Sequence, residues 1–129
     1  RAVGARNFPK YGSEGEDAFR GAFDEALSSL GACCPDGGKI VDLGCGSGIS
    51  TRRLAAANPH AAQVLGLDLS PYFLAVGRRL LHLSSTGDAA ACGTWVQPLM
   101  ADDRVDLRRA DAAQTGLDDG SVDVVCLSL

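Results

Sequence analysis

The chain has 129 residues and a formal net charge of −4, with 46% hydrophobic and 22% charged residues. These values are typical of one soluble globular domain and exclude a disordered chain. No run approaches the roughly 18 consecutive apolar residues that a membrane helix needs, and the acidic balance argues against non-specific nucleic-acid binding.

The five cysteines, an odd number, show no CxxC spacing and no ligand-like pairing with either histidine. We therefore expect small buried thiols in a reducing compartment, and no metal site. The chain begins with Arg1 and not with Met. The expected location is the cytoplasm, or a plastid or mitochondrion after removal of a targeting segment.

The first predicted element is a helix at about 16–30, within an N-terminal segment that comprises residues 1–38. Ser13 and Glu16 have the spacing of a capping box, and apolar residues then recur at helical intervals up to Gly31. A turn-rich link leads from this helix to the second unit, residues 39–129.

In the second unit, short apolar strands alternate with helices. Strands are predicted at 39–43, 64–68, 105–108 and 122–129, and helices at 49–58 and from Pro71 onward, with a long loop at 84–103. This alternation predicts an α/β fold, a Rossmann-like parallel sheet with flanking helices. A doubly wound sheet normally has more strands, so we expect about four strands here and a domain that is incomplete at its C-terminus.

Two of these elements carry finer predictions. Ser70 is a natural N-cap for the second of the two helices, and four apolar residues are expected to share one face of it: Phe73, Val76, Leu80 and Leu83. The last strand is almost continuously apolar, as a strand covered on both faces should be.

Three alternate glycines, Gly44, Gly46 and Gly48, follow the first predicted strand. They let the backbone pass close to a ligand, because no Cβ is in the way, and the helix behind them offers free N–H donors. The spacing differs from a dinucleotide fingerprint, since Ile49 stands where the third glycine is required, and it differs from a Walker loop. Asp42, two residues before the loop, is unfavourable beside phosphates and suits a cationic ligand with a ribose and an amino group.

Further acids stand at the ends of later strands. A carboxylate at Asp68 can accept hydrogen bonds from both hydroxyls of a ribose. Asp111 follows the third strand and is a candidate acceptor for an exocyclic adenine amine. Asp123, inside the last strand pattern, is expected to be a structural hydrogen-bond acceptor.

This set of residues resembles the class I S-adenosylmethionine-dependent methyltransferases. Residues 41–48 (VDLGCGSG) are similar to the first motif of that family, 66–71 (GLDLSP) to the second, 109–112 (RADA) to the third and 117–125 to the fourth. The fourth departs from the family pattern by lacking its usual proline and aromatic residue. The resemblance implies S-adenosylmethionine as the cofactor, and it implies these cofactor-binding residues: Asp42, Gly44, Cys45, Gly46, Ser47, Gly48, Asp68, Leu69, Asp111 and Ala112.

The implied activity is methyl transfer to a small-molecule acceptor, with no nucleic-acid partner and no membrane span. The methyl donor is already activated, so the protein mainly has to align donor and acceptor, and no residue stands out as a general base. Two alternatives stay open. One is a nicotinamide-dependent oxidoreductase on a similar sheet, which Ile49 and Asp42 disfavour. The other is a non-catalytic cofactor-binding or assembly module.

Overall fold

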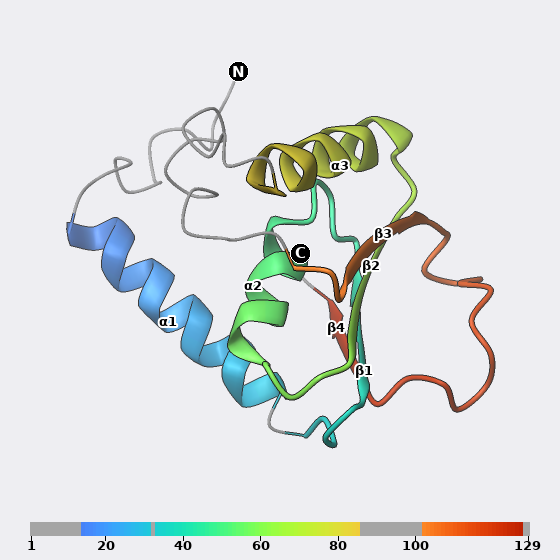
Figure 1. Ribbon diagram of the computed structural model, residues 1–129, viewed down its shortest axis with the longest axis horizontal. Helices are drawn as coiled ribbons and strands as arrows, with labels where there is room; N and C mark the ends of the chain where they lie inside the picture. The colour runs from blue at the N-terminus through green and yellow to red at the C-terminus, as the bar shows by residue number, and fades with distance from the viewer. Residues whose placement is uncertain (1–13, 32, 86–101, 128–129) are drawn as a thin grey trace.

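The computed structural model describes residues 14–31, 33–85 and 102–127, which form a parallel sheet flanked by helices (Figure 1). The helices are α1 (Glu14–Gly31), α2 (Ile49–Ala57) and α3 (Pro71–Ser85), and the strands are β1 (Lys39–Leu43), β2 (Gln63–Asp68), β3 (Val105–Arg109) and β4 (Val124–Leu127). The strand order is β3-β2-β1-β4, and all neighbouring strands are parallel. The predicted Rossmann-like architecture is confirmed.

The central strand, β1, sets where the loops meet. Asp42 of β1 pairs with Gly66 of β2 and with Cys126 of β4, and Asp68 at the end of β2 pairs with Arg109 at the end of β3. Parallel strands place all their carboxyl ends at one edge of the sheet, which is where α/β folds bind ligands. The glycine loop and the segments after Asp68 and Arg109 therefore share this edge.

The two faces of the sheet are covered differently. Figure 1 shows the three labelled helices on one side of the sheet and the segment before β4 on the other. On the helix side, α1 and α2 contribute to one core cluster, and α3 packs on β3 in another; the main members are Leu27, Ile40, Leu54, Val64, Leu74 and Leu107. On the opposite side, Val41, Leu65 and Leu67 pack against Leu117 and Val122.

The end of α2 is held by Arg104, a residue that precedes β3. Its guanidinium donates hydrogen bonds to three backbone carbonyls at and after the last turn of α2, those of Ala55 (2.8 Å), Asn58 (2.9 Å) and Ala61 (3.0 Å). A cation at the carboxyl end of a helix also interacts favourably with the helix dipole. Asp102 pairs with the same guanidinium at 2.6 Å, and this pairing lowers the pKa of Asp102.

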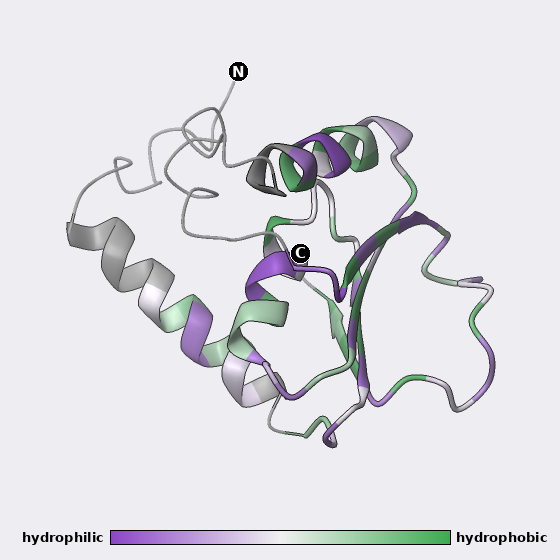
Figure 2. Ribbon diagram, in the orientation of Figure 1, coloured by the Kyte–Doolittle hydropathy of each residue, from purple (hydrophilic) through white to green (hydrophobic). Residues whose placement is uncertain are grey.

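The residue that α3 buries most deeply, Leu74, is not among the four apolar residues expected to share one face of this helix. Leu74 is 1% exposed and faces the sheet, whereas Phe73 and Val76 are 50% and 36% exposed. Figure 2 shows both hydrophobic and hydrophilic residues along α3, and apolar residues lie outside its buried face as well as within it. Close approach decides instead, because a Cβ at Gly77 would lie only 2.5 Å from the carbonyl oxygen of Ser47. The helix therefore turns the face that contains Gly77 inward.

The start of α3 follows the prediction, since Ser70 Oγ accepts a hydrogen bond from the backbone N–H of Phe73 at 3.3 Å. The other boundaries agree with the prediction to within two residues. The predictions for Ser13, for most of the long loop (86–101) and for residues 128–129 concern positions outside the described residues. None of the described helices is long and apolar enough to cross a bilayer.

The prediction that the last strand is covered on both faces is wrong for β4 in the described part of the chain. Val124 and Cys126 are buried, but Val125 and Leu127 are 57% and 60% exposed on the side away from the helices. Asp123 precedes the strand, and its Oδ2 accepts a hydrogen bond from the backbone N–H of Lys39 at 2.8 Å. This bond confirms the structural role predicted for Asp123 and aligns β4 with the start of β1.

Candidate functional site

The glycine loop turns the chain sharply from β1 into α2. Gly44, Gly46 and Gly48 have φ values of 71°, 56° and 78°, in the left-handed region that side chains with a Cβ rarely adopt. The backbone N–H groups of Gly44 and Cys45 both donate to the carbonyl oxygen of Leu67, at 2.8 and 3.1 Å. The loop is therefore fixed to the end of β2 by its own backbone.

The glycines of this loop have different surroundings. A Cβ at Gly48 would lie 2.8 Å from side-chain atoms of Leu107, so Gly48 is needed for packing. Among the described residues, and apart from its two chain neighbours, a Cβ at Gly46 would meet no atom within 4 Å. Open space next to a glycine is the arrangement expected where a ligand approaches the backbone.

Asp68 links the loop to β2. Its Oδ2 accepts a hydrogen bond from the backbone N–H of Gly46 at 2.8 Å, and its Oδ1 accepts one from the backbone N–H of Ser70, also at 2.8 Å. An ionised carboxylate has about four acceptor positions. Two of them are used by these backbone groups, so the half-buried Asp68 can still accept two hydroxyl donors from a ligand.

Asp42 lies behind the loop and is fully buried. Its Oδ2 accepts hydrogen bonds from the hydroxyls of Ser50 and Thr51, both at 2.7 Å. Both hydroxyls belong to the first turn of α2, where a negative charge is also favoured by the helix dipole. The structure thus connects Asp42 to the start of α2, and this connection was not predicted from the sequence.

One small residue, Gly66, makes room for the contact between Thr51 and Asp42. A Cβ at Gly66 would lie 2.7 Å from Thr51 Oγ1 and 2.9 Å from Cys45 Sγ, so glycine in β2 lets Thr51 reach Asp42. A glycine inside a strand is a sequence signal for such close approach. Hydroxyl residues directly after the glycine loop are the signal that could have located Ser50 and Thr51.

Cys45 is buried in the loop, and its thiol donates to the carbonyl oxygen of Gly46 at 3.7 Å. Burial, followed by the nearby carboxylates of Asp42 and Asp68, raises the pKa of Cys45 to about 12. The thiol is therefore neutral at physiological pH and is not a reactive nucleophile. Burial, and then Asp42, also raises the pKa of Cys126.

The segments after β2 and β3 lie beside this loop. Ala110 N–H donates to the carbonyl oxygen of Asp68 at 3.1 Å, which holds the next residue, Asp111, at the same edge of the sheet. Asp111 is exposed, and its Oδ1 accepts a hydrogen bond from Ala113 N–H at 2.9 Å. Leu69 is 58% exposed, and Ala112 is also exposed. All ten predicted cofactor-binding residues thus belong to three neighbouring segments, and three of the ten, Asp42, Cys45 and Gly48, are buried.

A separate hollow of about 270 Å³ lies on the opposite face of the sheet. Val41, Leu43 and Val125 line it from the sheet, and residues 115 and 117–122 line it from the segment before β4. Across the described parts of the chain, no cluster of three His, Cys, Asp or Glu side chains is placed to hold a metal ion.

The strand order, the left-handed glycine loop and the acid at the end of β2 define a Rossmann-like domain with its ligand edge at the carboxyl ends of the strands. Residues 41–129 match the family described as "Methyltransferase domain". The chain belongs to this family, within the class I S-adenosylmethionine-dependent methyltransferases.

Several known proteins are similar to this chain. It is 36% identical over 92 residues to a demethylmenaquinone methyltransferase of Clavibacter sepedonicus, a match that covers 71% of this chain and 29% of that protein. It is 58% identical over 43 residues to a trans-aconitate 2-methyltransferase of Methylobacterium nodulans, covering 33% of this chain and 16% of that protein. A solved geranyl diphosphate methyltransferase in complex with S-adenosylmethionine has the same fold, with a TM-score of 0.58 and 24% identity, over 91% of this chain and 44% of that one.

The matches therefore span less than a third of either curated relative. The cofactor of the family is S-adenosylmethionine. The residues present fit it, because the space in front of Gly46 would be filled by any Cβ, and the adjacent Asp68 retains acceptor positions for hydroxyl groups.

Proposed function

We propose that the protein containing this chain transfers a methyl group from S-adenosylmethionine to a small-molecule acceptor. The observation that carries the proposal is the combination at Gly46, which faces open space while its N–H contacts Asp68 at 2.8 Å. A ligand that approaches this backbone would also reach a carboxylate suited to ribose hydroxyls. The bound cofactor would supply a methyl group on a positively charged sulfur, so the chain's own task is alignment.

The roles of individual residues follow from their positions. Asp68 would accept the ribose hydroxyls, and the loop backbone at 44–48 would surround the methionine portion. Asp111, with Ala112 and Leu69 beside it, would contact the adenine. These three segments converge at one edge of the sheet, which supports this division of roles.

Asp42 has a different proposed role, because its carboxylate is fully buried. Through Ser50 and Thr51 it would hold the start of α2, and with it the geometry of the loop. It is therefore a positioning residue in this proposal. Its negative charge would still favour a cationic ligand nearby, since charges interact more strongly away from bulk water.

A small-molecule acceptor is supported by two observations. The named relatives are a trans-aconitate methyltransferase and a demethylmenaquinone methyltransferase. The chain has a net charge of −4, which disfavours binding to the phosphate backbone of a nucleic acid.

We also propose that residues 39–129 form the cofactor-binding unit and that the N-terminal segment contributes α1, whose Leu27 packs into the same core.

The test is calorimetric titration of the full-length protein with S-adenosylhomocysteine, S-adenosylmethionine and NAD. Saturable binding of the first two and no binding of NAD is the expected result. Binding of NAD alone would refute the proposal. The acceptor is tested with methyl-labelled S-adenosylmethionine and a panel of small carboxylic acids and phenols, with RNA and protein as comparison; label transferred only to a macromolecule would contradict the small-molecule acceptor.

A further inference from the structure

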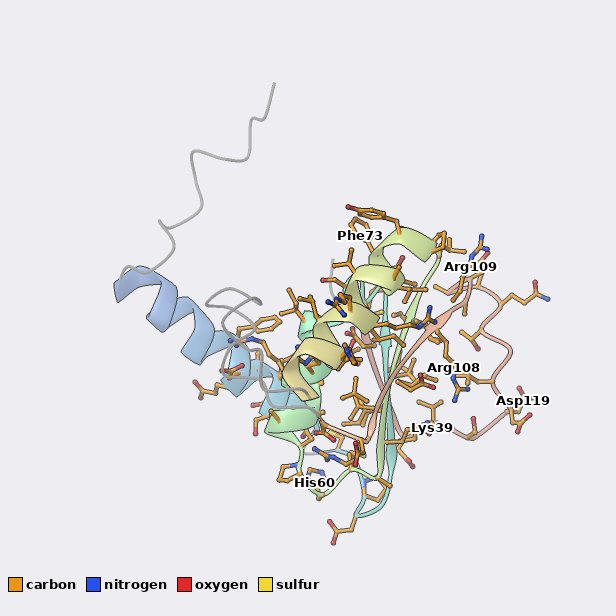
Figure 3. All side chains as sticks on the ribbon, turned by 45° about the horizontal axis from the view of Figure 1, so that its top comes forward. Lys39, His60, Phe73, Arg108, Arg109 and Asp119 are labelled. Carbon is orange, nitrogen blue, oxygen red and sulfur yellow. The ribbon has the colours of Figure 1, made fainter. Side chains whose placement is uncertain are left out.

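The outward face of α3 is apolar at its N-terminal end, where a helix facing water normally carries polar side chains. Tyr72, Phe73 and Val76 are 72%, 50% and 36% exposed. Tyr72 and Val76 are one turn apart, and the two aromatic rings lie 5.9 Å apart at an angle of 60°. Figure 3 shows Phe73 at the outer end of the helix. Contiguous exposed apolar side chains rimmed by polar ones are a feature of protein and membrane interaction sites.

The formally charged residues of α3 itself are all positive. Residues 71–85 contain no Asp or Glu in a chain that has 16 of them, and their formally charged residues are Arg78 and Arg79. Arg79 is exposed and follows Tyr72 by seven positions and Val76 by three, so it lies on the same helix face. We call Tyr72, Phe73, Val76 and Arg79 the α3 surface.

The neighbouring strand adds a further cation at the edge of the α3 surface. Arg109 Nε donates to the carbonyl oxygen of Leu69, the second residue before the helix, at 3.2 Å. Asp68, three positions before the helix, directs its two oxygens to the backbone N–H groups of Gly46 and Ser70. Figure 3 shows Arg109 and Phe73 toward the same end of the molecule.

We propose that the α3 surface docks onto a membrane surface that contains anionic phospholipids. Exposed aromatic and aliphatic side chains enter the boundary between headgroups and acyl chains, and arginines beside them attract anionic headgroups. Tyrosine suits this depth because its ring is apolar and its hydroxyl stays wet. The complementarity is local, since the whole chain carries a net charge of −4.

A second copy of the chain fits this surface less well. In a two-fold dimer the same patch would face itself, so arginines would meet arginines with no acid of α3 to compensate. Peripheral docking needs no spanning segment, and it is compatible with the absence of a spanning helix among the described residues.

The experiment is co-sedimentation of the full-length protein with vesicles of phosphatidylcholine alone and of phosphatidylcholine with phosphatidylglycerol. We expect binding to the anionic vesicles that decreases with added salt, because exposed charges are screened. Arg79→Glu should weaken this binding roughly 25-fold, about fivefold for the lost charge and about fivefold for the added opposite charge. The double variant Tyr72→Ser/Phe73→Ser should weaken it by about tenfold or more.

The matched control is Leu127→Ser, which removes an apolar side chain that is 60% exposed on the opposite side of the sheet. It should leave vesicle binding unchanged. Each variant is also titrated with S-adenosylhomocysteine, whose affinity should stay at the wild-type value if the site is folded. The proposal is overturned by a wild-type protein that does not sediment with anionic vesicles, because another segment or a protein partner then covers the surface. It is equally overturned if the control loses as much binding as the α3 variants.

Discussion

Gly46→Val tests whether the open space at the glycine loop is the ligand site. The φ of Gly46 is 56°, where an L residue costs roughly 1–2 kcal/mol and a β-branched residue somewhat more. In the part of the chain that the structure describes, a Cβ there meets no atom within 4 Å beyond its chain neighbours, so no clash with these residues adds to this strain. We therefore expect the free energy of unfolding to fall by about 2–3 kcal/mol, which leaves a domain of ordinary stability folded.

The effect on cofactor affinity should be much larger than the effect on stability. The valine side chain would occupy the space proposed for the cofactor, and a bridging water cannot relieve steric exclusion. We expect the dissociation constant for S-adenosylhomocysteine to rise more than about 100-fold, which corresponds to about 2.7 kcal/mol or more of binding free energy. This loss should exceed that of either acid in the site.

Two alanine variants separate backbone strain from ligand exclusion. Gly37 has a φ of 76° and, like Gly46, no atom of a described, non-adjacent residue within 4 Å of an added Cβ, but it lies in the turn between α1 and β1. Gly37→Ala and Gly46→Ala should lose similar stability, about 1 kcal/mol each, in urea unfolding. Only Gly46→Ala should lose affinity in calorimetry. A folded Gly46→Val protein that binds the cofactor product with wild-type affinity would refute the site.

Three further predictions rest on single contacts. Asp68→Ala should weaken S-adenosylhomocysteine binding by about one to two orders of magnitude, since each hydrogen bond to a charged acceptor is worth roughly 1.5–3 kcal/mol before water compensates. An unchanged affinity, or an equal loss of affinity in the control Asp106→Ala, would contradict this. Thr51→Val should lower the free energy of unfolding by about 1.5–3 kcal/mol in urea titration, with Thr51→Ser close to wild type, because a hydroxyl bound to a buried carboxylate is lost. Arg104→Met should destabilise the protein at pH 7, and the lowered pKa of Asp102 gives the sign of the pH dependence. The contribution of the pair to the free energy of unfolding is present above the unfolded pKa of about 3.9 and is lost as pH falls through the folded pKa. The difference in stability between variant and wild type should therefore shrink in acid.

The elements around the glycine loop could be predicted because their signals are local. β1 ends at a glycine cluster, α2 ends before Pro59, and α3 begins at Ser70 and Pro71, and each signal acts within a few residues. Parallel pairing then follows from the alternation of strands and helices. The shared edge of the sheet was therefore predictable before any contact was known.

The face of α3 and the cap on α2 were not predictable in this way. The buried face of α3 depends on the contact between Gly77 and Ser47, which are 30 positions apart, and Arg104 lies 43 to 49 positions from the carbonyls it binds. A helix with apolar residues on two faces has no local reason to prefer either one. Packing against the rest of the chain makes that choice.

Residue type and spacing locate a site more readily than they assign its members. Gly46 and Gly48 look alike in sequence, yet Gly46 faces open space and Gly48 packs so closely against Leu107 that a Cβ there would clash with its side chain. Asp42 and Asp68 are both acids at strand ends, yet one is fully buried against two hydroxyls and the other contacts the loop backbone. In each pair the difference is set by the packing of α2, α3 and β3, which cover one residue with protein atoms and leave the other open to a ligand. A substitution series that spans both pairs would therefore measure how much of the motif serves the ligand and how much serves the fold.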